Sequence, residues 1–170
     1  MSVTPSGMLS LPLENLRTLV AASAAFQAWV GATGETEAEL IASAKEHIYL
    51  VGLDGDNVVN ARPFAVVDHG ESWTLTRLAE PHTYRATGSL LLCFEDNVDA
   101  AHAGSIPDAQ LAFTNMVGDV VEDMFEKAGT DTYLAVSQIT LVRGPSRSAE
   151  TQQKTEGDFM QIVLQVDWGP

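Results

Sequence analysis

Apolar positions in the last third of the chain recur with two different periods. From residue 105 to residue 128 they return every three or four positions, which is typical of an amphipathic helix with one buried stripe. Residues 133–143 and 157–168 instead have the pattern of β-strands, and the second run alternates the more cleanly between its two faces. Ser105 is the expected N-cap of the helix. One face of the final strand should pack on the core, and it carries Met160, Ile162, Leu164, Val166 and Trp168.

Two further helices are predicted in the N-terminal part of the chain. Residues 10–30 carry a helical stripe of large apolar side chains, and Gly31 is suited to end that helix. Thr36 followed by Glu39 has the spacing of a capping box. This box predicts a second, shorter helix that continues to about residue 46.

The middle of the chain has the pattern of β-strands joined by turns. Segments rich in Asp, Gly and Asn at residues 54–57 and 68–71 carry turn chemistry. A β-meander is the simplest topology for such a series. The expected strands are residues 47–53, 62–68, 72–78 and 83–95.

These elements predict a single α+β domain over residues 10–170. Its antiparallel sheet combines the meander with the two C-terminal strands, and it packs with the N-terminal helix and the helix near 106–128. Residues 1–9, interrupted by Pro5 and Gly7, are expected to form a flexible arm. A chain of 170 residues can bury a core of its own and requires no second domain.

The charge balance disfavours tight binding to nucleic acid. The chain has 23 acidic and 9 basic residues, with a formal net charge of −14. Its cations are scattered, so no cluster can neutralise successive phosphates. An acidic surface suits a protein that sits beside DNA without binding it, and it serves solubility equally well.

Catalytic and metal-binding motifs are missing from the sequence, so we expect no enzymatic activity, metal or cofactor. The segment 68–72 contains Asp, His and Ser, but no nucleophile-elbow glycines surround Ser72. Residues 54–57 resemble part of a calcium loop without its distal glutamate. The single cysteine, Cys93, lies within an apolar strand, as a buried structural thiol would. No metal-ligand spacing relates the four histidines, which are His47, His69, His82 and His102.

Two polar features are candidate interaction sites. The segment 144–156 lies between the two C-terminal strands, is too long and too charged for a tight hairpin, and contains the cations Arg147 and Lys154. One face of the helix at 105–128 is strongly acidic, and a solvated surface is the alternative explanation for it. The acidic residues are Asp119, Glu122, Asp123 and Glu126.

This order of elements resembles that of the tail terminator proteins of long-tailed bacteriophages, over residues 10–169. The resemblance implies a structural virion protein that forms a homo-oligomeric ring, typically a hexamer. Such a ring caps the tail tube and joins it to the head-side neck. The implied partners are further copies of the chain, the tail tube protein and a head-side neck or stopper protein, with genomic DNA passing through the lumen without specific binding.

The resemblance also implies a location in the tail or neck of the virion. The N-terminus lacks the basic and apolar regions of a signal peptide, and no run approaches the ~18 apolar residues needed to span a bilayer. We therefore expect assembly in the host cytoplasm and no membrane association. The extra helical segment at 36–46 departs from the smaller family members. That departure leaves another neck or head–tail connector protein as an alternative.

A rival interpretation from a different class is a small cone-shaped α+β domain that binds a ligand or acts as an enzyme. It predicts a pocket lined by Trp73, Tyr84, Phe94 and His82.

Overall fold

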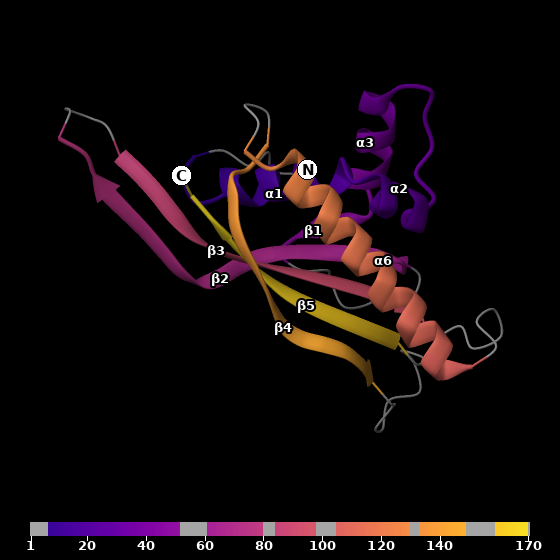
Figure 1. Cartoon of the computed structure of the whole chain (residues 1–170). Coiled ribbons are helices and arrows are strands. Elements are labelled where there is room, and N and C mark those ends of the chain that lie inside the picture. The colour runs from indigo at the N-terminus through magenta and orange to yellow at the C-terminus, as the bar shows by residue number, and fades with distance from the viewer. Residues whose placement is uncertain are drawn as a thin grey trace.

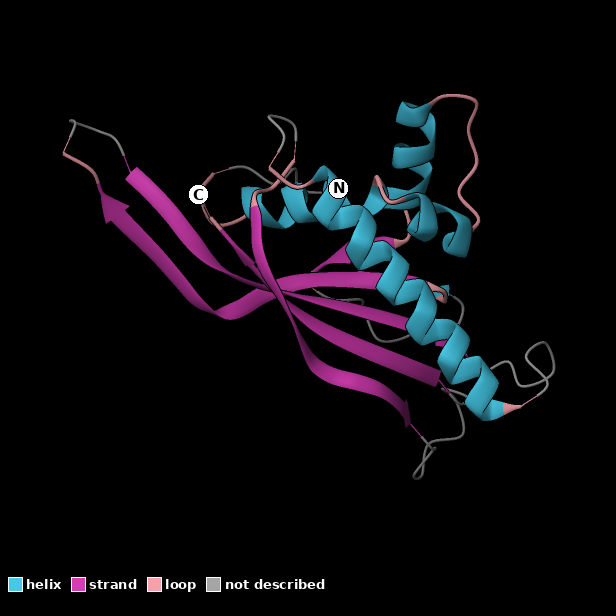
Figure 2. Ribbon diagram, viewed as in Figure 1, coloured by secondary structure: helices cyan, strands magenta, loops and turns pink. Residues whose placement is uncertain are grey.

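Five strands form one sheet, and the helices pack on one of its faces (Figures 1 and 2). The computed structural model describes residues 7–51, 61–79, 84–97, 105–129, 133–148 and 159–169. The strand order is β1-β2-β3-β5-β4, antiparallel except that β1 runs parallel to β2. The expected α+β class, with a mainly antiparallel sheet, is therefore confirmed. The strands are β1 (Ile48–Leu50), β2 (Phe64–Arg77), β3 (Tyr84–Asn97), β4 (Val136–Ser148) and β5 (Phe159–Trp168).

The N-terminal stripe folds as two helices, so the single helix predicted over residues 10–30 is wrong. α1 spans Leu11–Ala21 and α2 spans Ala24–Val30. They are separated at Ser23, whose hydroxyl accepts a hydrogen bond from the amide of Phe26 at 3.1 Å. A serine that caps a new helix competes with continuation of the old one, which explains the break. Gly31 ends α2 in the left-handed conformation, as expected.

Helices α3 and α6 begin where the sequence predicts. α3 spans Glu37–Lys45 and begins with the full capping box: the Thr36 hydroxyl accepts from the Glu39 amide, and the Glu39 carboxylate accepts from the Thr36 amide. α6 spans Ile106–Lys127, and Ser105 caps it by accepting from the amide of Asp108. The local sequence is sufficient to predict where both helices begin, because each capping side chain and the amide that it accepts from lie within four residues of each other.

The middle strands differ from a simple meander. The runs at 62–68 and 72–78 form one strand, β2, so the hairpin turn predicted at 68–71 is wrong. Between the pairs His69–Leu90 and Trp73–Gly88 the register shifts, and residues 70–72 lie opposite Ser89 alone. The turn-forming residues thus make a bulge that bends the strand without ending it.

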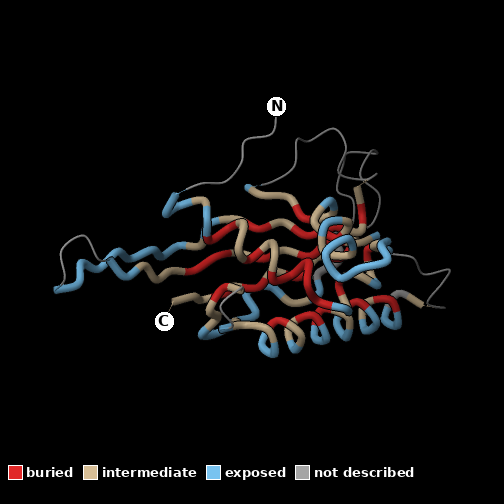
Figure 3. The backbone as a smooth tube through the Cα atoms, turned by 90° about the horizontal axis from the view of Figure 1, so that it is seen from above, coloured by how far each residue is buried: buried red, intermediate tan, exposed pale blue. Residues whose placement is uncertain are grey.

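Gly70 is required at this bulge because its backbone lies against β3. A Cβ atom at this position would lie 2.7 Å from the backbone oxygen of Ser89. No larger residue fits there without moving the backbone. The bulge marks the point at which β2 leaves the covered part of the sheet (Figure 3).

The core lies between the sheet and the helices α1, α2 and α6. Trp29 packs its ring against Phe26, Phe94 and Phe113, with ring centroids 5.6 to 6.0 Å apart, and its indole Nε1 donates to Asp96 Oδ2 at 2.9 Å. The predicted inward face of β5 is confirmed: Met160, Ile162, Leu164 and Val166 are buried, and Trp168 packs against the same core.

Two segments named in the sequence analysis fall partly outside the described residues. β4 continues to Ser148, so residues 144–148 are strand and not the start of a loop. Residues 149–156 and residues 1–6 lie outside the described part of the chain. Within the described residues, no helix is both long enough and apolar enough to cross a membrane.

Candidate functional site

The fold separates one residue of the predicted acidic face of α6 from the other three. Asp119, Glu122 and Glu126 are exposed, but Asp123 turns toward α2. Its Oδ2 atom accepts hydrogen bonds from Ser23 Oγ at 2.7 Å and from the amide of Ala25 at 3.1 Å. Asp123 therefore helps to cap α2, and the other three carboxylates remain available at the surface.

The pKa of Asp123 reflects these contacts. Partial burial raises the pKa, but the hydrogen bonds from Ser23 and from the α2 backbone, with the charge of Lys127, outweigh it. The net pKa is lowered, so the carboxylate is ionised at neutral pH. Its negative charge lies at the positive end of α2.

The two cations predicted as interface residues are only partly within the described structure. Arg147 belongs to β4, where its backbone pairs with Met160 of β5. Lys154 lies outside the described residues. A contact between either cation and another protein remains a prediction.

The pocket expected for a cone-shaped ligand-binding domain is not formed by the predicted residues. Phe94 is fully buried in the core, whereas Trp73 and Tyr84 are 38% and 50% exposed. His82 lies outside the described residues. The three described aromatic residues therefore line no common cavity.

Trp73 and Tyr84 belong instead to a two-stranded extension of the sheet. We call residues 73–77 of β2 and 84–88 of β3 the β2–β3 arm; it projects beyond the other strands (Figures 1 and 3). Register and alternation place Trp73, Leu75 and Arg77 on one face, opposite Tyr84 and Ala86. Hydroxyl side chains dominate the other face, which carries Thr74, Thr76, Thr87 and Arg85.

A second unpartnered apolar surface lies between α6 and β4. This α6–β4 groove has a volume of about 270 Å³. Phe125 and Leu141 on its rim are 47% and 59% exposed. Gly118 leaves it open on the helix side, since a Cβ atom there would meet nothing within 4 Å. Its apolar lining also includes Val117, Val121, Ile139 and Leu164.

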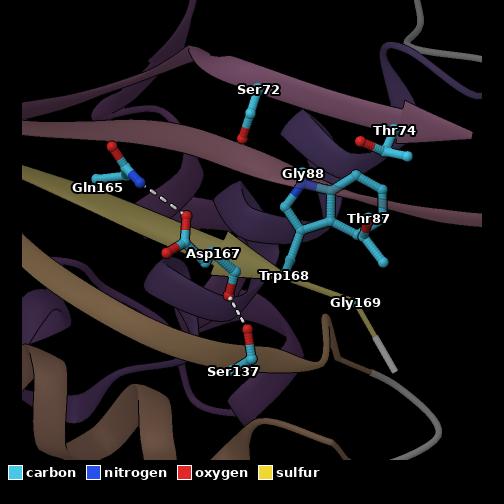
Figure 4. Close-up of a pocket in the computed structure, with 9 residues that line it drawn as sticks. All are labelled: Ser72, Thr74, Thr87, Gly88, Ser137, Gln165, Asp167, Trp168 and Gly169. Carbon is cyan, nitrogen blue, oxygen red and sulfur yellow. Dashed lines mark hydrogen bonds between the residues drawn. The ribbon is translucent and has the colours of Figure 1, made fainter.

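A polar hollow of about 430 Å³ lies where the arm joins the body (Figure 4). Gln165 Nε2 donates to Asp167 Oδ1 at 2.9 Å, and Ser137 Oγ donates to the backbone oxygen of Asp167 at 3.1 Å. Asp167 is the only ionisable side chain among the nine described residues that line this hollow. The lining therefore contains no acid–base pair of the kind that general catalysis needs.

A buried ion pair that the sequence does not predict lies on the sheet face opposite the helices. Arg62 Nε lies 2.7 Å from Glu95 Oε1, and the guanidinium stacks 4.5 Å from the ring centroid of Phe159. Gln161 Nε2 donates to the second Glu95 oxygen at 3.4 Å. The sequence held no signal for this pair because its members are 33 residues apart and meet only through strand pairing.

Cys93 lies on the same sheet face and is unsuited to nucleophilic chemistry. Burial, and then the nearby charge of Glu95, raise the pKa of its thiol to about 12. The thiol is therefore protonated at neutral pH. Among the described residues, no group of His, Cys, Asp and Glu side chains has the arrangement of a metal site.

Comparison with known proteins identifies no family for this chain. No family model matches it, and no curated protein sequence matches it. Among solved structures, it is similar to a chain of the virion of a native gene transfer agent particle, at 13% sequence identity and a TM-score of 0.37. That similarity covers 99% of this chain and 100% of the other. A similarity of this size leaves the function to be argued from the geometry of the chain itself.

Proposed function

We propose that this protein is a structural subunit of a long-tailed phage virion, a tail terminator that forms a homo-oligomeric ring. The ring caps the tail tube and joins it to the head-side neck protein. The observation that carries this proposal is the β2–β3 arm, whose apolar face is covered by no described part of the chain.

An exposed β-ribbon of this kind is expected to bind a partner. A two-stranded ribbon is marginally stable alone, and an exposed apolar face on it marks an interaction site. In a homo-oligomer every copy can cover its apolar face through the same contact, and a closed ring stops growing at a defined number of subunits. The order of helices and strands, which resembles that of tail terminators, supports the choice of ring.

The acidic charge fits a ring through which DNA passes. A net charge of −14 repels the phosphate backbone at short range, so DNA slides through without binding. Arg147 and Lys154 are proposed contacts to an acidic surface of the tail tube or of a neighbouring subunit. Replacing both with glutamate should slow joining to tubes and leave thermal stability unchanged.

The second candidate is a neighbouring head–tail connector or neck protein, which the additional helix α3 favours. α3 is held against the body through Arg17, whose guanidinium donates to the backbone oxygen of Lys45 at 2.6 Å. It is thus an ordered part of the subunit and offers a surface that the smaller tail terminators lack.

Mass in solution and electron microscopy of tails test the proposal. Six copies of the 18.2 kDa chain form a particle of about 109 kDa. We expect this mass by light scattering, and a ring at the head-proximal end of isolated tail tubes. A monomer that also fails to join tubes overturns the proposal, and a ring that joins heads instead of tubes selects the connector role.

A further inference from the structure

The β2–β3 arm and the α6–β4 groove are two unpartnered apolar features of the described residues. On the arm, Trp73 and Leu75 are 38% and 40% exposed and lie on one face with Tyr84. In the groove, Phe125 and Leu141 are more exposed than either. A ribbon with one apolar face and a groove of apolar side chains are complementary in chemistry, because contact between them removes both apolar surfaces from water.

The charges at these two features are opposite. The arm carries two of only nine cations in the chain: Arg77 on its apolar face and Arg85 on the opposite face. On α6, Glu122 lies one turn beyond Gly118 and three residues before Phe125, so it borders the groove, and Glu126 follows it one turn later. In a chain with a net charge of −14, a cation on an apolar face is suited to an acidic, apolar site such as this groove.

The arm cannot reach the groove of its own subunit. Figures 1 and 3 show the arm pointing away from α6 and β4, beyond the end of the remaining sheet. The contact must therefore join two copies, and it joins two different surfaces. Such heterologous contacts propagate around a ring when the rotation between copies closes.

We propose that the arm of each subunit lies against the α6–β4 groove of the next copy of this chain. Trp73 and Leu75 cover Phe125 and Leu141, and Arg77, which shares their face, is directed at Glu122 and Glu126. This inference rests on the ring of the proposed function and names the surfaces that close it.

Two variants block the two sides of the contact without disturbing the fold. Gly118→Trp fills the groove, and a side chain there begins in open space. Removing a glycine from a helix interior also favours the helix. Leu75→Asp places a charge on the apolar face of the arm, at a position already 40% exposed.

Each blocking variant has a matched control. Gly118→Ala makes the same change to the helix but leaves the groove open. Thr76→Asp adds the same charge to the opposite face of the arm. Both controls should assemble as the parent does.

Sedimentation of the single variants and of their mixture tests the proposal. Each blocked variant should be monomeric where the parent is a ring. An equimolar mixture should give a 1:1 dimer, because the intact arm of the Gly118→Trp chain meets the open groove of the Leu75→Asp chain. The dimer cannot grow, since its remaining arm and groove are both blocked.

The outcomes separate this inference from the proposed function. A Gly118→Trp variant that still forms the parent ring, or a mixture that stays monomeric, overturns the arm–groove contact and leaves the ring intact as a proposal. The same variants are also scored for joining to isolated tail tubes, which detects rings that form only there. A parent chain that is monomeric and joins no tubes overturns both.

Discussion

The inner and outer halves of the β2–β3 hairpin differ in burial although the same two strands form both. In the inner half, Val67 and its partner Leu92 are fully buried beneath the helices. In the outer half, beyond the bulge, Leu75 is 40% exposed. The backbone pairing is antiparallel throughout, so the difference lies in what covers the ribbon.

The comparison shows that the sequence pattern of a strand specifies which side chains share a face, but not which part of the protein covers that face. Successive side chains point to opposite faces in both halves, and this alternation of direction fixes which side chains share a face. Helices cover the apolar face of the inner half, whereas no described residue covers that of the outer half (Figure 3). An apolar face left open in this way indicates contact with another molecule.

The largest expected effect is that of a charge in the inner half. Leu92→Asp buries an unpaired carboxylate and should cost on the order of 5 kcal/mol, comparable with the whole stability of a domain. Leu75→Asp in the outer half should change the free energy of unfolding by less than about 1 kcal/mol. Urea denaturation followed by circular dichroism measures both, and equal losses would show that the arm belongs to the folding core.

Removal of the arm should have a smaller effect on stability and a complete effect on assembly. Replacing residues 73–88 with Asn-Gly joins Ser72 to Ser89, whose hydroxyls already lie 3.3 Å apart, through a two-residue turn. The melting temperature should stay within a few degrees of the parent because the arm buries little apolar surface. Ring formation should be lost. Normal rings from the shortened chain would contradict an assembly role for the arm.

A polar contact in the body provides a moderate effect for comparison. Asp123→Asn weakens the cap of α2 and should cost about 1 kcal/mol at neutral pH, or roughly 2–4 °C in melting temperature. Because the pKa of Asp123 is lowered in the folded state, its stabilising effect is complete well above pH 3.8 and is lost as the pH falls through the lowered pKa. Melts of parent and variant should therefore converge in acid. A difference in melting temperature that stays constant down to the lowered pKa would assign the loss of stability to packing alone.

The smallest effect concerns the reactivity of thiols in the two halves. Cys93, in the inner half, has a pKa raised to about 12 and should be alkylated slowly by iodoacetamide at pH 8. A cysteine introduced at Leu75 in a Cys93→Ala background should react at the rate of an ordinary exposed thiol. Rapid alkylation of Cys93 in the folded parent would show that the inner sheet opens readily.

The sequence by itself determined the features that depend on near neighbours. The capping box of α3, the cap of α6 and the inward face of β5 were all predicted correctly, because each rests on residues within a few positions or on strict alternation. The α+β class followed from the order of these elements. The acidic surface of α6 was likewise apparent from the sequence, although its role remains a proposal.

The tertiary structure alone decided the features that depend on distant residues. The break at Ser23 is stabilised by Asp123, a hundred residues away. β2 continues through a turn-like segment because β3 pairs with it on both sides of Gly70. The exposure of Trp73 and Leu75 depends on where the helices end over the sheet, which no local pattern encodes. The candidate interface was found in the structure for this reason: burial is a property of the packed chain, and periodicity specifies only which residues share a face.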